Sequence, residues 1–283
     1  MKFTKMIGAG NDFVIYNGLE YNINNYNELA LKSCDRHFSV GADGMMVCEK
    51  SQIADIKMKY YNSDGSRGEM CGNGIRCFSK YVYDNKLVSS KEFTVETLAG
   101  IKKIVLETDE NNEVCTVKVN MGYPTFGAKS IPVNMDKEEV ISEKMIIDGK
   151  EIVFSSVLVG VPHTVIFVDS IKLININDLG QKIENHSLFP KKTNVNFIEV
   201  LDREHINIYT WERGAGRTLG CGTGSCASVV IGHKLGKLDN IVEVKTEGGD
   251  LQVELKADYE IYMKGGAKTI CIGEFMSENG SLV

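Results

Sequence analysis

Two short segments of this chain repeat each other, and each opens with a cysteine followed by Gly-x-Gly. The first, at residues 71–77, reads CGNGIRC, and the second, at residues 221–226, reads CGTGSC. Each follows a polar turn and precedes a stretch with the character of a helix. A chain that builds the same cysteine-bearing helix start twice is expected to contain two copies of one fold, with one site formed from two similar halves.

Other features recur at the same spacing of about 150 residues, in the same order. The matched pairs are Gly10-Asn11 with Gly160-Val161, Gly44 with Asn194, Asn62-Ser63 with Glu212-Arg213, and, with a shift one residue shorter, 93–100 with 242–249. A period this long is not that of a solenoid. The sequence therefore predicts two similar domains, the first formed by residues 1–120 plus about 267–283 and the second by residues 121–266.

Each half is rich in short runs that alternate between apolar and polar residues, which is typical of strands. Residues 225–232 are small or apolar on nearly all sides, as expected of a buried helix. The predicted fold is α+β, with two pseudo-symmetric domains that each wrap a curved, mostly antiparallel, barrel-like sheet around a central helix. Further helices are expected at 28–36 and 179–186, a charged surface excursion between the halves at 136–150, and a frayed tail at 277–283.

Composition excludes several classes of function. The net charge of −6 argues against nucleic-acid binding, which favours a basic surface. No apolar run approaches the roughly 20 residues that span a membrane, and the first residues break into Gly and Asn-Asp too early for a signal peptide. A cytoplasmic location, without nucleic-acid or membrane partners, is the expectation.

The eight cysteines are expected to be thiols and not a disulfide framework. No zinc site is predicted, because structural zinc sites favour closer cysteine pairs and no paired histidines accompany these. A thiol-based metal or redox module remains an alternative of another class. Six of the cysteines are expected to be small buried hydrophobic residues, namely Cys34, Cys48, Cys77, Cys115, Cys226 and Cys271.

The remaining two cysteines, Cys71 and Cys221, lie at predicted helix N-termini, where a thiol ionises more easily. A thiol has a reference pKa near 8.5, and a helix N-terminus lowers it. The same N–H groups bind a carboxylate, and glycines let the backbone approach it closely. Two such termini could hold one amino-acid carboxylate with a sulfur on each side of its α-carbon, which predicts two-base racemisation or epimerisation.

Other kinds of binding or catalytic site have less support in the sequence. Neither Gly-rich segment matches a P-loop or a dinucleotide fingerprint. A cysteine–histidine nucleophile pair would take His163 as its partner, but would need no second thiol. A related isomerase that uses a carboxylate base on a cyclic substrate would lack the cysteine pair.

Nearly the whole chain resembles the diaminopimelate epimerase family of pyridoxal-phosphate-independent enzymes. The resemblance is carried by residues 3–6 and 10–13, by 62–66 leading to 71–77, by 211–216 leading to 221–224, and by 262–265. It implies a cytosolic, cofactor-free homodimer with two catalytic bases, Cys71 and Cys221. It also implies backbone donors to the substrate carboxylate at Gly72, Asn73, Gly222 and Thr223, and substrate-holding side chains at Asn11, Asn62, Asn194, Glu212 and Arg213.

Two positions depart from the pattern that the resemblance implies, and both are candidates for specificity. Val161 stands where the family usually has Asn in Gly-Asn-Pro-His, and Gly44 stands where many members have Gln. Diaminopimelate, converted from LL to meso for lysine and peptidoglycan precursor synthesis, is the favoured substrate, since Asn62, Asn194, Glu212 and Arg213 are all present. A racemase of another polar amino acid, such as histidine, is the alternative that Val161 favours.

Overall fold

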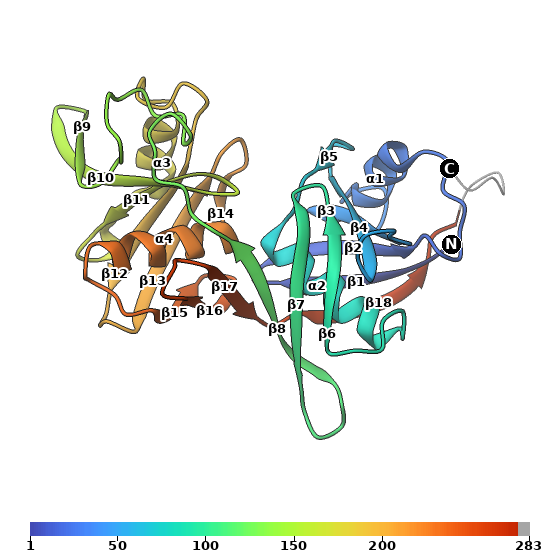
Figure 1. Cartoon of the computed structure of the whole chain (residues 1–283). Coiled ribbons are helices and arrows are strands. Elements are labelled where there is room, and N and C mark those ends of the chain that lie inside the picture. The colour runs from blue at the N-terminus through green and yellow to red at the C-terminus, as the bar shows by residue number, and fades with distance from the viewer. Residues whose placement is uncertain (277–283) are drawn as a thin grey trace. The chain divides into compact units, whose positions relative to one another are not determined.

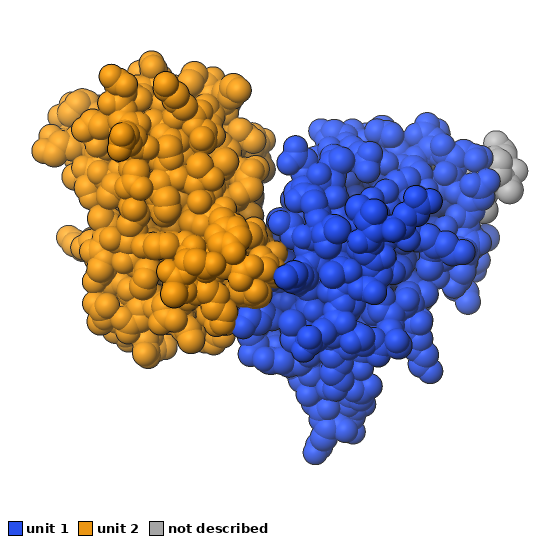
Figure 2. All heavy atoms as spheres, in the orientation of Figure 1, with its two compact units in different colours: residues 1–119, 264–283 blue, residues 120–263 orange. Residues whose placement is uncertain are grey.

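The computed structural model describes residues 1–276, and the predicted frayed tail at 277–283 lies outside the described residues. The chain divides into two compact units (Figures 1 and 2). Unit 1 contains residues 1–119 and the segment that begins at Lys264, and unit 2 contains residues 120–263. Strand β8 (Val114–Gly122) takes the chain from unit 1 to unit 2, and β17 (Ile261–Gly265) brings it back.

Unit 1 consists of strands around one central helix, with a shorter helix at the side. Its further elements are β1 (Lys2–Gly8), β2 (Asn11–Asn17), α1 (Tyr26–Cys34), β3 (Gly44–Glu49), β4 (Ile56–Asn62), β5 (Arg67–Gly68), α2 (Gly72–Asp84), β6 (Glu92–Thr97), β7 (Gly100–Thr108) and β18 (Lys268–Glu274).

Unit 2 repeats this order and adds a hairpin strand and a 3₁₀ turn. Its further elements are β9 (Glu143–Ile147), β10 (Lys150–Val159), β11 (Val161–Phe167), η1 (Ile171–Leu173), α3 (Ile176–Glu184), β12 (Asn194–Val200), β13 (His205–Glu212), β14 (Gly216–Thr218), α4 (Gly222–Lys234), β15 (Ile241–Thr246) and β16 (Gly249–Leu255).

Strand pairing repeats in register between the units. Strands β2 and β3 are parallel with Phe13 opposite Gly44, and β11 and β12 are parallel with His163 opposite Asn194. Each unit has a second parallel pair, β4 with β6 and β13 with β15. The hairpin pairs in both units are antiparallel. The predicted α+β fold with two repeated halves is confirmed.

The side helices begin at asparagine caps that occupy equivalent positions. Asn25 accepts a hydrogen bond from the backbone of Glu28 at 3.2 Å, and Asn175 accepts one from Asp178 at 3.4 Å. Each cap satisfies an N–H group that lacks an intrahelical partner. The helices therefore start before the predicted residues 28 and 179 and end before 36 and 186.

The central helices α2 and α4 are buried almost throughout, as the small and apolar residues of 225–232 predicted. Helix α2 packs on β1, β2 and β3, and α4 packs on β10, β11, β12 and β16. Strand faces supply the rest of each core. In β15, for example, Val242, Val244 and Thr246 are buried and alternate with exposed residues.

The charged segment 136–150 is largely exposed, as its composition predicted, but it belongs to one unit and does not lie between the halves. It lies in unit 2, where β9 forms a hairpin with β10. Val140, Met145 and Ile147 are buried in the unit 2 core, together with Phe154 and Phe189. A minority of apolar residues at alternating positions is enough to dock this hairpin, although charged residues dominate its composition.

Among residues 1–276, no helix is long and apolar enough to cross a membrane.

Candidate functional site

Each of the two repeated cysteines is the N-cap residue of a central helix. Cys71 precedes α2 and Cys221 precedes α4, and both have extended backbone angles. The backbone N–H of Gly74 donates to the Cys71 sulfur at 3.4 Å, and that of Gly224 donates to the Cys221 sulfur at 3.3 Å. The sulfur takes the place that a Ser or Asp oxygen usually holds at a cap. Both thiols therefore lie against the positive end of a helix, which favours negative charge on sulfur.

The two helix starts differ in the side chain that follows each cysteine by two residues. In unit 1 the Asn73 amide, which is 2% exposed, donates to Asn11 Oδ1 at 2.7 Å. In unit 2 the Thr223 hydroxyl lies 3.4 Å from the Cys221 sulfur. Gly72 and Gly222 are the first helical residues and are buried. Unit 1 thus places the side chains of Asn73 and Asn11 in contact at the helix start that Cys71 caps.

Asn11 is held by a carboxylate that the sequence analysis did not identify. Its amide donates to Asp43 Oδ2 at 2.9 Å. Asp43 also forms an ion pair at 2.6 Å with Arg36, which bridges to Asp12 at 2.7 Å. Burial raises the pKa of Asp12, but hydrogen bonds and charges from Arg36 and Lys5 outweigh it and lower the value to about 2. The network fixes the Asn11 amide with its oxygen toward Asn73.

Gly44 and Asn62 lie opposite each other on β3 and β4. A Cβ atom at residue 44 would lie 2.7 Å from the Tyr60 ring and 2.8 Å from the Tyr61 carbonyl oxygen. Asn62 donates to the Ser66 hydroxyl at 3.0 Å in the turn that follows β4. The Tyr60 ring therefore fills the space beside Gly44, and a glutamine there would require this ring to move.

In unit 2, Asn194 joins two parts of the predicted site. Its amide donates to the Pro162 carbonyl at 2.8 Å, next to Val161, and its oxygen accepts from the Arg213 backbone at 2.9 Å. Arg213 is exposed, and its guanidinium donates to the Lys191 carbonyl at 3.2 Å. Glu212 accepts from the Thr218 hydroxyl at 2.7 Å. Thus Asn194, Arg213 and the start of β11 at Val161 form one cluster.

A buried carboxylate holds the turn that carries Glu212 and Arg213. Glu184, which is 4% exposed, accepts from the Trp211 indole at 2.7 Å and from the Gly214 backbone at 3.1 Å. These donors flank the two candidate substrate-binding residues on either side. Sequence reasoning missed Glu184 because it ends a helix about 30 residues upstream and belongs to no local motif. Its position opposite Trp211 arises only from tertiary packing.

His163, the candidate partner in a cysteine–histidine pair, is fully buried on β11. Burial, with a smaller contribution from the Arg213 charge, lowers the pKa of His163 to about 3. Its Nδ1 atom lies 3.2 Å from the Asn196 amide nitrogen, and its Nε2 atom has no hydrogen-bond partner among the described residues. The imidazole is therefore neutral at physiological pH.

We expect this histidine to make unit 2 sensitive to acid. The unfolded chain binds a proton at His163 below about pH 6.5, whereas the folded chain binds one only near pH 3. Its contribution to stability is fully present above pH 6.5 and is lost as the pH falls toward 3, with a slope of up to about 1.4 kcal/mol per pH unit. Denaturant unfolding followed by fluorescence of Trp211, the only tryptophan, should show a shallower slope for His163→Asn.

His205→Asn is the matched control for this measurement. His205 is exposed, and its hydrogen bond to Asp202 raises its pKa, so protonation favours the folded state. Removing it cannot relieve the loss of stability in acid. An unchanged slope in His163→Asn would contradict the assignment of His163 as a buried neutral group.

The other six cysteines fall into two groups. Burial raises the pKa of Cys34, Cys48 and Cys77 to about 12, and Cys226 is also fully buried. Cys115 and Cys271 are exposed, so the prediction that they are buried hydrophobic residues is wrong. Cys115 lies on β8 near a register shift in its pairing with β7, and Cys271 lies on β18, whose residues are nearly all exposed.

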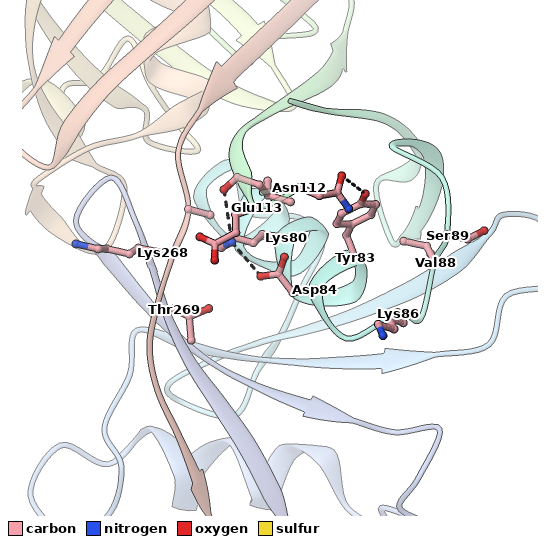
Figure 3. A pocket seen from close by; sticks show the side chains of 12 residues that line it. Lys80, Tyr83, Asp84, Lys86, Val88, Ser89, Asn112, Glu113, Lys268 and Thr269 are labelled. Atoms are coloured by element: carbon pink, nitrogen blue, oxygen red, sulfur yellow. Dashed lines mark hydrogen bonds and ion pairs between the residues drawn. The ribbon is translucent and has the colours of Figure 1, made fainter. Parts of the chain in front are cut away.

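No group of three or more His, Cys, Asp or Glu side chains within residues 1–276 is arranged to hold a metal ion. A pocket of about 830 Å³ does occur in unit 1 (Figure 3). Its walls come from the end of α2, the β7–β8 turn and the start of β18, and its polar groups pair with one another: Lys80 with Asp84 at 2.9 Å and Tyr83 with Asn112 at 3.2 Å. Lys80 lies about 13 Å along α2 from Cys71, so this pocket is separate from the cysteine site.

Comparison with known proteins finds one family along most of the chain. The diaminopimelate epimerase family model matches residues 3–127 and 155–270. The diaminopimelate epimerase of Caldanaerobacter subterraneus is 50% identical over 97% of this chain and 99% of its own length. That of Alkaliphilus metalliredigens is 47% identical over 98% of each chain.

Solved structures of lower identity share the fold. A probable proline racemase from Agrobacterium radiobacter aligns with a TM-score of 0.73 at 15% identity, covering 99% of this chain and 94% of that one. A PhzF-family phenazine biosynthesis protein from Bacillus anthracis aligns with a TM-score of 0.69 at 18% identity, covering 98% and 99%. From the full-length relatives and the family match, this chain belongs to the diaminopimelate epimerase family.

Proposed function

We propose that this protein interconverts LL- and meso-diaminopimelate by inverting one α-carbon with two cysteines. The observation that carries the proposal is the pair of equivalent helix caps, in which Cys71 and Cys221 each accept an N–H from a glycine three residues later. One thiolate takes the α-proton as the C–H bond breaks, and the other thiol gives its proton to the opposite face. The substrate follows from relatives of that name that are up to 50% identical over nearly the whole chain.

The roles of the other residues follow from their chemistry. The backbone N–H groups at the start of α2 and α4 suit the reacting carboxylate. Arg213 suits a distal carboxylate, which a guanidinium binds through two parallel hydrogen bonds, and Glu212 suits an ammonium. Asn11, Asn62 and Asn194 orient these groups. No cofactor takes part, because the proton is transferred between sulfur and carbon alone.

Incubation of the purified protein with candidate amino acids in D2O tests the proposal. Deuterium should appear at an α-carbon of diaminopimelate. Exchange at histidine but not at diaminopimelate would overturn the substrate and would favour the racemase that Val161 suggests. Val161→Asn restores the amide that the family resemblance implies, so it should raise kcat/KM for diaminopimelate if a polar contact is lost at this position.

We further propose a cytoplasmic homodimer formed through unit 1. Strand β18 pairs with β1, yet it leaves two large apolar side chains exposed, Ile270 at 56% and Ile272 at 72%. A second copy of the chain would cover them, since exposed apolar patches mark interaction sites. Light scattering should give the mass of two chains for the wild type and of one chain for Ile272→Asp. A monomeric wild type at micromolar concentration would refute the dimer.

Glu184→Gln should weaken substrate binding more than turnover. Trp211 and Gly214 donate to different oxygens of Glu184, and glutamine replaces one of these oxygens with an NH2 group, so the turn with Glu212 and Arg213 loses one anchor. A buried donor left without a partner costs about 1–3 kcal/mol. We expect KM to rise by roughly tenfold with a smaller change in kcat. Glu28→Gln, which changes an exposed carboxylate on α1, is the control, and equal effects of the two would contradict a positioning role for Glu184.

A further inference from the structure

Unit 2 contains a polar cluster beneath the first turn of α4. Its members come from three neighbouring strands, with His163 on β11, Asn196 on β12 and Thr210 on β13. All three are at most 3% exposed. A Cβ atom built on Gly224, in the helix start that Cys221 caps, would lie 2.4 Å from Asn196 Oδ1. Asn196 therefore connects the histidine to the cysteine-bearing helix.

The hydrogen bonds of Asn196 fix which way its amide points. The side chain lies 3.4 Å from the Thr164 carbonyl oxygen, which can only accept, so the NH2 group faces that side. On its other side the amide oxygen accepts from the Thr210 hydroxyl at 3.2 Å. Reversing the amide would place its oxygen against a carbonyl oxygen inside the core.

This orientation in turn decides where His163 carries its proton. The Asn196 NH2 group lies 3.2 Å from His163 Nδ1, so Nδ1 must accept. A neutral imidazole has one N–H, and it must then be at Nε2. That N–H is fully buried and has no partner among the described residues. A buried polar group without a partner is rare and calls for a specific explanation.

The repeated half shows that the fold does not need this polar pair. The positions equivalent to His163 and Asn196 in unit 1 are Phe13 and Met46. Both pack near Gly74, with Met46 Sδ 3.3 Å and the Phe13 ring 3.5 Å from the Cβ position. An apolar pair therefore supports the equivalent helix start in unit 1. The polar pair in unit 2 serves something other than packing.

We propose that Asn196 is a positioning residue that holds His163 in its Nε2–H tautomer, as a hydrogen-bond donor to a carboxylate of the bound amino acid. His163 lies opposite Asn194 in register and close enough to Arg213 to feel its charge, which is where the proposed function places a carboxylate. The nature of the ligand rests on that proposed function, whereas the tautomer does not. The same tautomer excludes His163 as a base, because its Nε2 lone pair is already protonated.

Nitrogen NMR of ¹⁵N-histidine-labelled full-length protein tests the tautomer directly, with the His163→Asn spectrum assigning the signals. We expect Nε2 to be protonated and Nδ1 unprotonated, without titration between pH 5 and 8. Asn196→Asp places an acceptor at Nδ1 and should move the proton to that atom or make the ring cationic. Thr210→Val removes only the bond to the amide oxygen and should leave the tautomer unchanged.

A wild-type spectrum with the proton on Nδ1 overturns the proposal, even if no Asn196 variant folds. A folded Asn196→Asp protein with the wild-type tautomer also overturns it. Saturating diaminopimelate should shift the Nε2–H proton resonance downfield, and an unmoved resonance would overturn the assigned ligand. Where the proton moves to Nδ1 in Asn196→Asp, loss of the Nε2–H donor should lower kcat/KM by about 10- to 100-fold, whereas a cationic ring keeps this donor. Because the tautomer is measured without substrate, a wild-type protein that lacks epimerase activity would contradict only the proposed function.

Discussion

Cys71→Ala and Cys221→Ala should each abolish net epimerisation while leaving the protein folded. General acid–base catalysis contributes about 10²–10⁴-fold, and inversion needs one group on each face of the α-carbon. Either loss should therefore lower kcat by at least roughly 10³-fold, although the second thiol remains. The measurement is the rate at which LL-diaminopimelate becomes the meso form, together with deuterium exchange at the α-carbon in D2O. Any exchange that remains in a single variant should occur at carbons of only one configuration.

Cys77→Ala and Cys226→Ala are the matched controls, because these cysteines lie in the same two helices but are fully buried. Their loss removes a small apolar group and should affect stability more than turnover. Labelling experiments need a Cys115→Ser/Cys271→Ser background, since both of these thiols are exposed and react with any probe. Substantial inversion by either Cys71→Ala or Cys221→Ala would rule out the two-base assignment.

The repeat at a spacing of about 150 residues made much of this fold predictable. It anticipated that α2 and α4 begin after Cys71 and Cys221, and the strands that flank them pair in matching registers. The starts of α1 and α3 were placed too late, although a signal was present. Asn25 followed three residues later by Glu28 is a capping pattern, and it lies in an Asn-rich stretch that resembles a loop.

The supporting groups of the site could not be predicted in the same way. The roles of Glu184 and Asn196 depend on contacts between segments that lie about 15 to 35 residues apart in the sequence. Neither residue belongs to a local motif. The exposed cysteines show a related difficulty. Near the shift between Glu107 and Thr108, the β7–β8 pairing leaves Val114 and Val117 buried and Cys115 exposed. Period-two alternation fails across such an irregularity.

Gly224→Ala should be far more damaging than the equivalent change Gly74→Ala. The new methyl group in unit 2 would lie 2.4 Å from Asn196 Oδ1 and 3.2 Å from Cys221 Cβ. Asn196 cannot move away without breaking its bonds to His163 and Thr210, which are buried. Overpacking costs about 1–3 kcal/mol and each orphaned polar group costs a similar amount. We expect the free energy of unfolding to fall by roughly 3 kcal/mol or more and the activity to be lost. Denaturant unfolding monitored by the fluorescence of Trp211, which lies in unit 2, measures the change in stability.

In unit 1 the same methyl group would lie 3.3 Å from Met46 and from Cys71 and 3.5 Å from the Phe13 ring, and a methionine side chain adapts easily. Gly74→Ala should therefore cost less than about 1 kcal/mol, because alanine also favours the helix. The double variant Gly224→Ala/Asn196→Ala removes the colliding oxygen, so its loss of stability should be smaller than the sum of the single losses. Strict additivity would mean that the clash with Asn196 is not the cause. The difference in stability between Gly224→Ala and Gly74→Ala would then have a cause other than the polar cluster beneath α4.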